Sequence, residues 1–278
     1  MLRVALLQLN VTDDPSANLP QTLDMVRDAA QAGATMVFTP EVTNCVSGSR
    51  SHQSRVLMNQ ADDITLAALR DAARDLNIWI NIGSLALKSD TTDDARFHNR
   101  SFVIDPRGNI VAQYDKIHMF DVTLSETEQY RESDGYRAGD HAVIADTAFG
   151  RIGMTICYDI RFPHLYRGLA KSGASILLIP AAFAQPTGRA HWEVLLRARA
   201  IETGCYVIAA AQTGEHQTSQ RRPRKTYGHS MIVSPWGEIM ADAGEDQGII
   251  YADLDLSLVE STRARVPSIL SNQSFSEP

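Results

Sequence analysis

Short apolar runs alternate with amphipathic stretches along the whole chain. The first run, Leu2–Leu9, is followed by residues Ser16–Ala32, in which apolar side chains recur every three or four positions. Short apolar runs predict buried strands, and a period near 3.6 residues predicts helices. Strands and helices are therefore interleaved from end to end, and no linker rich in Pro, Gly or Ser separates them. This arrangement favours one α/β domain with mixed sheets.

The same periodicity predicts the remaining elements. Residues Ile117–Gly139 are polar and aperiodic, and long loops of this kind in compact domains usually carry function. Strands are expected at Ala34–Thr39, Ile78–Leu87, Ser101–Asp105, Ile110–Tyr114, Ala142–Ala145, Ile152–Cys157, Ser175–Pro180, Tyr206–Ala211, Ser230–Val233, Glu238–Ala241 and Gly248–Asp253. Helices are expected at Ile64–Leu76, Pro163–Lys171, His191–Thr203 and from about Asp255.

Composition excludes several classes of protein. The 278 residues are 44% hydrophobic and 21% charged, which is unlike a disordered or coiled-coil chain. The net charge of −7 argues against nucleic-acid binding, and the short basic run Arg221–Lys225 is expected to be a solvated loop. No apolar stretch is long enough to span a membrane. Three cysteines without CxxC spacing fit a reducing compartment, so we expect a cytoplasmic protein.

Three reactive side chains follow apolar strands. Glu41 comes after Met36–Pro40, Lys116 after Ile110–Asp115, and Cys157 after Ile152–Ile156. The ends of strands are where α/β folds place their sites. A thiol, a carboxylate and an ammonium form a working set for acyl transfer, although each residue alone could be structural.

The expected chemistry needs no histidine. An adjacent ammonium lowers the pKa of a thiol, and a nearby carboxylate can take the thiol proton and later deprotonate water. The lysine, with the backbone N–H that follows the nucleophile, can stabilise the oxyanion of a tetrahedral intermediate.

Other chemistries find less support in the sequence. No HExxH, HxH or i,i+4 histidine pair suggests a metal site. His118 could pair with Cys157 as a cysteine-protease dyad, but this alternative is weaker. GxSxG, GxGxxG and P-loop motifs are missing, so a serine hydrolase or a nucleotide cofactor is not indicated, and we expect no cofactor.

Three segments carry a resemblance to a known family. They are Thr39-Pro40-Glu41, Tyr114–His118 and Gly153–Pro163, and together they resemble the carbon–nitrogen hydrolase (nitrilase) superfamily. The resemblance implies Glu41 as general base, Lys116 as oxyanion stabiliser and Cys157 as nucleophile. It also implies a second glutamate that orients them; Glu132 matches best, with Glu126 and Glu128 as competitors.

The resemblance further implies an αββα four-layer sandwich with two mixed sheets. It implies that two such protomers join into an αββα–αββα homodimer or a higher homo-oligomer. We expect a single domain over residues 1–278, with a core of about 1–266 and a C-terminal tail at 267–278.

Two segments narrow the resemblance to one branch. Ala190–Thr203 and Tyr227–Met231 resemble the amidases that act on deaminated glutathione, whose near relatives are ω-amidases for α-ketoglutaramate. The implied reaction hydrolyses the amide of a 2-oxo acid through a thioester on Cys157. The alternatives are an N-carbamoyl-amine or nitrile hydrolase with the same residues, and a catalytically idle binding protein.

The substrate contacts are less defined than the reactive residues. Arg161 is expected to be structural, so no cation is assigned to the substrate carboxylate. The segment Gly214–Lys225 looks longer and more basic than usual for the family, and could shape the pocket mouth or contact another protomer. Candidates for lining the substrate pocket are Tyr158, Phe183, Thr187 and Trp192.

Overall fold

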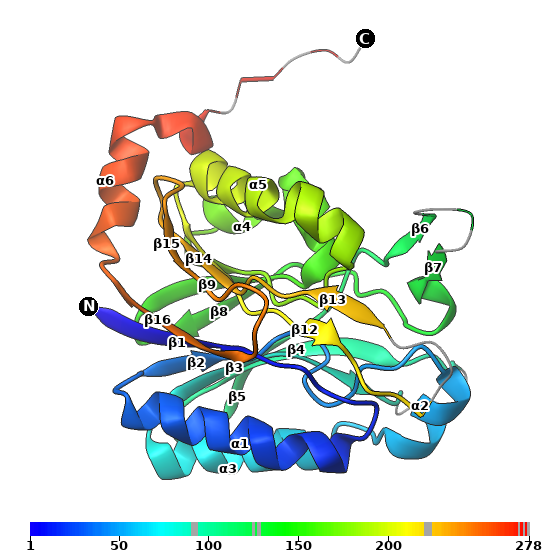
Figure 1. The fold of residues 1–278 in the computed structure, drawn as a ribbon. Helices are drawn as coiled ribbons and strands as arrows, with labels where there is room; N and C mark the ends of the chain where they lie inside the picture. Colours follow the sequence, from blue (N-terminus) through cyan, green and yellow to red (C-terminus); the bar gives the residue numbers. More distant parts are fainter. Residues whose placement is uncertain are drawn as a thin grey trace.

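Two six-stranded sheets lie face to face in the computed structural model, and helices cover their outer faces (Figure 1). The structure describes residues 1–89, 94–123, 126, 129–219, 224–271, 273, 274 and 276. From the bottom of Figure 1 upward, the layers are α1 and α3, the first sheet, the second sheet, and α4 with α5. The expected αββα architecture, with two mixed sheets, is confirmed.

The first sheet has the strand order β16-β1-β2-β3-β4-β5. Its three central strands β1, β2 and β3 are parallel, and the outer strands pair antiparallel. The bounds are β1 (Leu2–Gln8), β2 (Met36–Phe38), β3 (Trp79–Leu87), β4 (His98–Ile104), β5 (Ile110–Asp115) and β16 (Gly248–Leu254), with α1 at Pro15–Gln31 and α3 at Ile64–Leu76.

The second sheet repeats this plan with the order β15-β14-β11-β10-β9-β8. Its strands β9, β10 and β11 are parallel. The bounds are β8 (Val143–Thr147), β9 (Gly150–Met154), β10 (Ala174–Leu178), β11 (Tyr206–Ala209), β14 (Met231–Val233) and β15 (Ile239–Asp242), with α4 at Pro163–Lys171 and α5 at Gln185–Thr203.

Alternation along the central strands divides the core into layers. In β1, Val4 and Leu6 belong to the cluster that also contains the second sheet's side chains, whereas Ala5 and Leu7 pack in the cluster with α1 and α3. Successive side chains of a strand point to opposite faces, so a strand with both faces covered is apolar throughout. This explains why the strands appear in the sequence as unbroken apolar runs.

The remaining elements lie at the edges of the sandwich. The stretch expected to be an aperiodic loop, Ile117–Gly139, contains two short paired strands and a 3₁₀ turn, and a helix that the sequence did not indicate begins at Arg50 after its N-cap Ser49. These elements are β6 (Asp121–Thr123), β7 (Gln129–Arg131), β12 (Thr213–Glu215), β13 (Lys225–Tyr227), α2 (Arg50–Val56), α6 (Ser257–Arg265), and 3₁₀ turns at Glu132–Asp134, Cys157–Arg161 and Pro267–Leu270.

Two expected boundaries need correction. Helix α5 starts at Gln185, six positions before the expected His191, because Pro186 is tolerated in the first turn and Gly188 lets the helix approach Tyr227. Strand β9 ends at Met154 and not at Cys157, since the Asp159 side chain takes the N–H of Ile156 at 2.9 Å. No helix within the described ranges has both the length and the apolar character needed to cross a bilayer.

Candidate active site

Glu41 lies just after β2 and is almost completely buried, with 4% of its surface exposed. Its Oε1 accepts hydrogen bonds from Lys116 Nζ at 2.9 Å and from Asn99 Nδ2 at 2.8 Å. Its Oε2 accepts the backbone N–H of Ala182 at 2.7 Å. The carboxylate is thus held by Asn99 and Lys116 from the first sheet and by Ala182, which follows β10 of the second sheet.

Lys116 directly follows β5, and its side chain is among the largest fully buried ones in the chain. Its Nζ donates to Glu41 Oε1 at 2.9 Å and to the two oxygens of Glu132 at 2.9 and 2.8 Å. Burial acts to lower the pKa of the ammonium, but Glu132 and Glu41 outweigh it and raise that pKa well above its usual value. Lys116 is therefore charged at every physiological pH.

Glu132 opens a 3₁₀ turn in the loop before β8, and its Oε2 also accepts the N–H of Phe120 at 2.6 Å. Of the competing glutamates, Glu126 is exposed and Glu128 lies outside the described residues. Among the described glutamates of this loop, Glu132 is the one that contacts Lys116.

Cys157 begins the 3₁₀ turn after β9 and has a positive φ of 49°. A non-glycine residue in this left-handed region is strained, and such strain is concentrated at functional sites. The residue is 6% exposed, its thiol interacts electrostatically with Glu41 and Lys116, and its backbone N–H donates to the carbonyl of Pro180 at 2.9 Å. The turn holds the sulfur at the end of its strand beside the carboxylate and the ammonium.

The pKa of the thiol differs from the sequence-based expectation. Burial raises the pKa of Cys157 well above 9.0, and the neighbouring Glu41 carboxylate raises it further, while Lys116 lowers it by less. For Glu41, burial raises the pKa, but Lys116 and Arg224 outweigh burial and bring it down to about 2. The resting site therefore holds a neutral thiol, an ammonium and a carboxylate at Glu41.

Asp159 ties the cysteine turn to the segment that carries Lys116. It is completely buried, and its Oδ1 accepts the backbone N–H of His118 at 3.0 Å and lies 2.7 Å from His118 Nδ1. Its Oδ2 accepts from Ile156 N at 2.9 Å and from the Tyr114 hydroxyl at 2.7 Å. His118 thus pairs with Asp159, and its ring stacks on Phe162 with 3.5 Å between ring centroids.

Asn99 in β4 is a second residue that the sequence did not single out. Its Nδ2 donates to Glu41 Oε1 at 2.8 Å and to Glu132 Oε1 at 3.3 Å, and its backbone carbonyl accepts the N–H of Lys116 at 3.0 Å. One asparagine therefore positions both carboxylates and the lysine backbone. The spacing of 58 residues between Asn99 and Glu41 gives no local sequence signal.

Glu41, Lys116 and Cys157 line a pocket of about 640 Å³. Tyr158 and Phe183, two of the four candidates for substrate contacts, also line it. Thr187 and Trp192 do not: Thr187 donates its hydroxyl to the carbonyl of Ala184, and Trp192 is fully buried behind Phe183, with 4.8 Å between ring centroids. The other lining residues include Asn99, Glu132, Phe120, Tyr136, Arg50, Arg131, Thr218, Arg224 and Lys225.

The basic residues near the site take different positions. Arg161 does not line the pocket; its guanidinium lies 5.5 Å from the centroid of the Phe183 ring and its Nη2 is 3.2 Å from His191 Nδ1. Of the segment Gly214–Lys225, both Arg224 and Lys225 line the pocket, whereas Arg221 and Arg222 lie outside the described residues.

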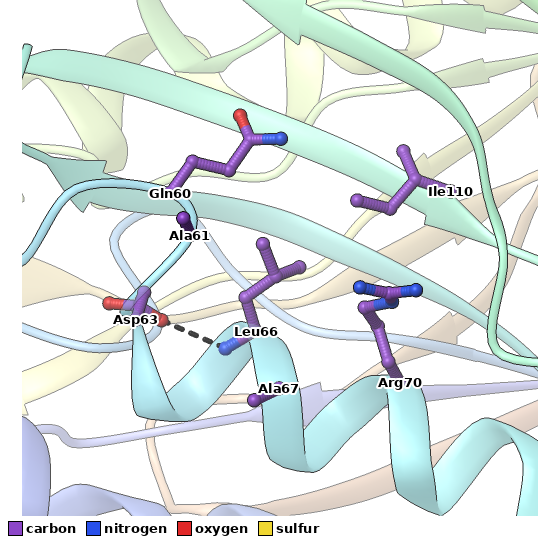
Figure 2. A pocket seen from close by; sticks show the side chains of 7 residues that line it. All are labelled: Gln60, Ala61, Asp63, Leu66, Ala67, Arg70 and Ile110. Atoms are coloured by element: carbon purple, nitrogen blue, oxygen red, sulfur yellow. Dashed lines mark hydrogen bonds between the residues drawn. The ribbon is translucent and has the colours of Figure 1, made fainter. Parts of the chain in front are cut away.

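A second pocket, of about 320 Å³, lies beside the start of α3 (Figure 2). Figure 2 shows Gln60, Leu66 and Arg70 around it, with Asp63 capping the helix through a 2.8 Å bond from Leu66 N. It shares no lining residue with the larger pocket. Within the described part of the chain, no group of three or more His, Cys, Asp or Glu side chains is arranged to hold a metal ion.

Comparison with known proteins gives consistent matches along the chain. The family model described as carbon-nitrogen hydrolase matches residues 3–264. A deaminated glutathione amidase of Yersinia enterocolitica is 38% identical over 97% of this chain and 92% of its own length, and one of Dictyostelium discoideum is 36% identical over 95% and 91%.

Solved structures agree with the sequence matches. The Caenorhabditis elegans NitFhit protein superposes with a TM-score of 0.89 at 38% identity, covering 98% of this chain and 65% of that one. Saccharomyces cerevisiae Nit3, of the nitrilase superfamily, gives a TM-score of 0.83 at 30% identity, with 96% and 94% covered.

Proposed function

This chain belongs to the carbon-nitrogen hydrolase family and is an amidase of that family; from this premise we propose that it hydrolyses the amide of a 2-oxo acid with Cys157 as nucleophile, Glu41 as general base, Lys116 as oxyanion stabiliser and Glu132 as positioning residue. The observation that carries the proposal is the buried cluster in which Lys116 bridges the carboxylates of Glu41 and Glu132 in the pocket that Cys157 also lines.

The first half of the reaction forms a thioester. Glu41 takes the proton of Cys157 as the sulfur attacks the amide carbon, and Lys116 with the N–H of Tyr158 stabilises the oxyanion. Because the raised pKa keeps the resting thiol protonated, ionisation accompanies attack. The C–N bond then breaks, the leaving amine takes the proton from Glu41, and the acyl group remains on the sulfur.

The second half returns the enzyme to its resting state. Glu41 deprotonates a water that attacks the thioester carbon, and the carboxylic acid is released as the proton returns to the Cys157 sulfur. Glu132 and Asn99 keep Lys116 and Glu41 in place through both halves.

The preferred substrate of this proposal is deaminated glutathione, which would give 2-oxoglutarate and cysteinylglycine. This preference is supported by relatives described as deaminated glutathione amidases, which are 36–38% identical to this chain over nearly its whole length. The pocket also contains cations suited to an anionic substrate.

The test is steady-state hydrolysis of an amide panel by wild type and by Cys157→Ala. The panel contains deaminated glutathione, α-ketoglutaramate, an N-carbamoyl β-amino acid and a simple nitrile. Highest kcat/KM on deaminated glutathione, lost in the variant, supports the proposal. Highest kcat/KM on α-ketoglutaramate moves the protein to ω-amidases, and inactivity on every compound contradicts the substrate class.

We also propose that the chain forms a homodimer through α5 and its neighbours. Val194 and Ile201, seven residues apart on α5, are 67% and 53% exposed, and Ile201 packs against Gly237 next to the exposed Trp236. These three exposed apolar side chains, with Arg197 between them donating to the carbonyl of Gly237 at 2.9 Å, form the surface on which this proposal rests. Light scattering should give twice the chain mass, and Ile201→Asp should lower it; a monomeric wild type contradicts the proposal.

A further inference from the structure

One cation of the large pocket has no carboxylate partner among the described residues. The guanidinium of Arg224 donates a single hydrogen bond there, from Nη2 to the carbonyl of Ala182 at 2.7 Å, and its buried Nε has no partner. Buried donors are normally satisfied, and an unpaired one carries a cost that an anionic ligand can relieve.

Three of the other cations that line the pocket pair with carboxylates, and Arg131 is bonded to two carbonyls. Lys116 is engaged by Glu41 and Glu132. The exposed cations Arg50 and Lys225 pair with Asp134 at 3.1 Å and Glu215 at 2.8 Å, and Arg131 donates to the carbonyls of Val122 and Tyr130. Among these cations, Arg224 is the one with a buried N–H that lacks a partner in the described residues, so it is the one suited to bind an external carboxylate.

Hydrogen bonds hold the backbone from Arg224 to Tyr227 in place. Its carbonyl accepts the N–H of the buried His216 at 2.9 Å, and Tyr227, three residues on, donates its N–H to Phe183 at 3.0 Å. His216 is itself anchored, with Nδ1 2.7 Å from the carbonyl of Val11 and Nε2 2.8 Å from the hydroxyl of Thr226. A side chain held by such a frame is preorganised for a ligand.

Ala182 places Arg224 on one particular side of the site. The N–H of Ala182 binds Glu41 Oε2, and the carbonyl of the same residue binds Arg224. A base that returns its proton to the departing amine must lie beside that amine, so the leaving group is next to Glu41. A two-residue leaving peptide spans about 7 Å when extended, and the backbone of one residue, Ala182, connects Glu41 to Arg224 through a hydrogen bond on each side.

We propose that Arg224 binds the carboxylate of the departing amine and thereby selects peptide-like amides over primary amides. The inference rests on the proposed function, because it needs Glu41 as the base and an amide substrate with a carboxylate on its leaving side. Arginine suits this role because its planar fork matches a carboxylate.

The experiment compares Arg224→Gln with wild type on three amides. Deaminated glutathione has a carboxylate on its leaving side, its C-terminally amidated form lacks that carboxylate, and α-ketoglutaramate releases only ammonia. Arg189→Gln is the matched control, since Arg189 is exposed on α5 and does not line the pocket. Arg224→Lys, which keeps the charge without the fork, guards against a general folding defect.

We expect Arg224→Gln to lower kcat/KM for deaminated glutathione by about 10- to 100-fold, the effect of losing a hydrogen-bonded charge pair. Its kcat/KM for α-ketoglutaramate should fall by a smaller factor, because this substrate loses only the effect of the Arg224 charge on Glu41. Amidation should cost wild type a similar factor and cost Arg224→Gln almost nothing, because the two changes remove one interaction.

Four results overturn the inference. An equal loss on all three amides assigns Arg224 to the positioning of Glu41, and unchanged hydrolysis of deaminated glutathione removes it from the substrate. A wild type that hydrolyses α-ketoglutaramate but not deaminated glutathione overturns the Arg224 inference and the preferred substrate, but leaves the proposed 2-oxo-acid amidase activity standing. A wild type inactive on all three amides overturns the proposed function as well.

Discussion

The base of the active-site pocket and its rim are built by different means. The base holds Glu41, Lys116 and Cys157, each of which directly follows or closely follows a strand and is at most 6% exposed. The rim holds Arg50 in α2, Arg131 in β7 and Arg224 directly before β13 (Figure 1).

This difference separates chemistry from selectivity. Groups at the base are held by several hydrogen bonds from both sheets, so their geometry is set by the folding of the whole sandwich. The rim residues belong to peripheral segments, whose sequence can vary without disturbing the two six-stranded sheets. We therefore expect changes at the base to lower kcat for every amide, and changes at the rim to act on individual substrates.

The largest effect is expected at Cys157, the proposed nucleophile. Cys157→Ala should lower kcat by at least about 10⁴-fold, since no other group can form the thioester, and should leave the fold intact. Steady-state hydrolysis and thermal unfolding measure the two effects. Cys205→Ala is the control, because Cys205 is equally buried but does not line the pocket. Residual turnover near the wild-type rate in Cys157→Ala contradicts a thioester mechanism.

Removing Lys116 should affect both rate and stability. Lys116→Ala should slow acylation by about 10²–10³-fold through loss of an oxyanion donor. It also leaves Glu41 and Glu132 without their shared cation, which should lower the free energy of unfolding by about 3–5 kcal/mol. Rapid-quench acylation and urea unfolding test this. Lys116→Arg should recover part of the stability, and a wild-type acylation rate in Lys116→Ala removes Lys116 from the chemistry.

The charge state of Glu41 links the base of the pocket to pH. Burial raises its pKa, yet Lys116 and Arg224 bring it to about 2, below the usual 4.5. A lowered carboxyl pKa stabilises the fold above pH 4.5, by about 3 kcal/mol here, and this stability is lost as pH falls towards 2. The free energy of unfolding of wild type should therefore fall more steeply than that of Glu41→Gln between pH 5 and 2. Parallel pH dependences contradict the low pKa.

Much of the fold could be predicted because its signals are local. Helices α3 and α4 have the predicted first and last residues, since Asp63 caps the first and Pro163 opens the second. Strands buried on both faces form apolar runs that are easily recognised. The helix α2 is short and mostly polar, so its sequence has no apolar period to detect.

The site was only partly predictable for the same reason. Glu41, Lys116 and Cys157 follow strands and lie in recognisable motifs, and the structure brings them together with Glu132. Asp159 and Asn99 act through contacts with residues 41 and 58 positions away, which sequence spacing cannot indicate. The net pKa of the Cys157 thiol depends on burial against charge, and only the folded environment decides which is larger.

The smallest effect that still distinguishes base from rim is expected at Asn99. Asn99→Ala removes one hydrogen bond from each of Glu41 and Glu132, while Lys116 continues to hold both carboxylates. We expect kcat to fall by about 10-fold with every amide and KM to change little, because the loss concerns the catalytic groups and not the substrate.

Asn81→Ala is the matched control: Asn81 is buried in β3, bonds Phe102 and Ser101, and does not line the pocket. If both variants lose stability but neither loses kcat, Asn99 supports the sheet and not the chemistry. If Asn99→Ala instead discriminates between amides, the boundary between base and rim lies deeper in the pocket than β4.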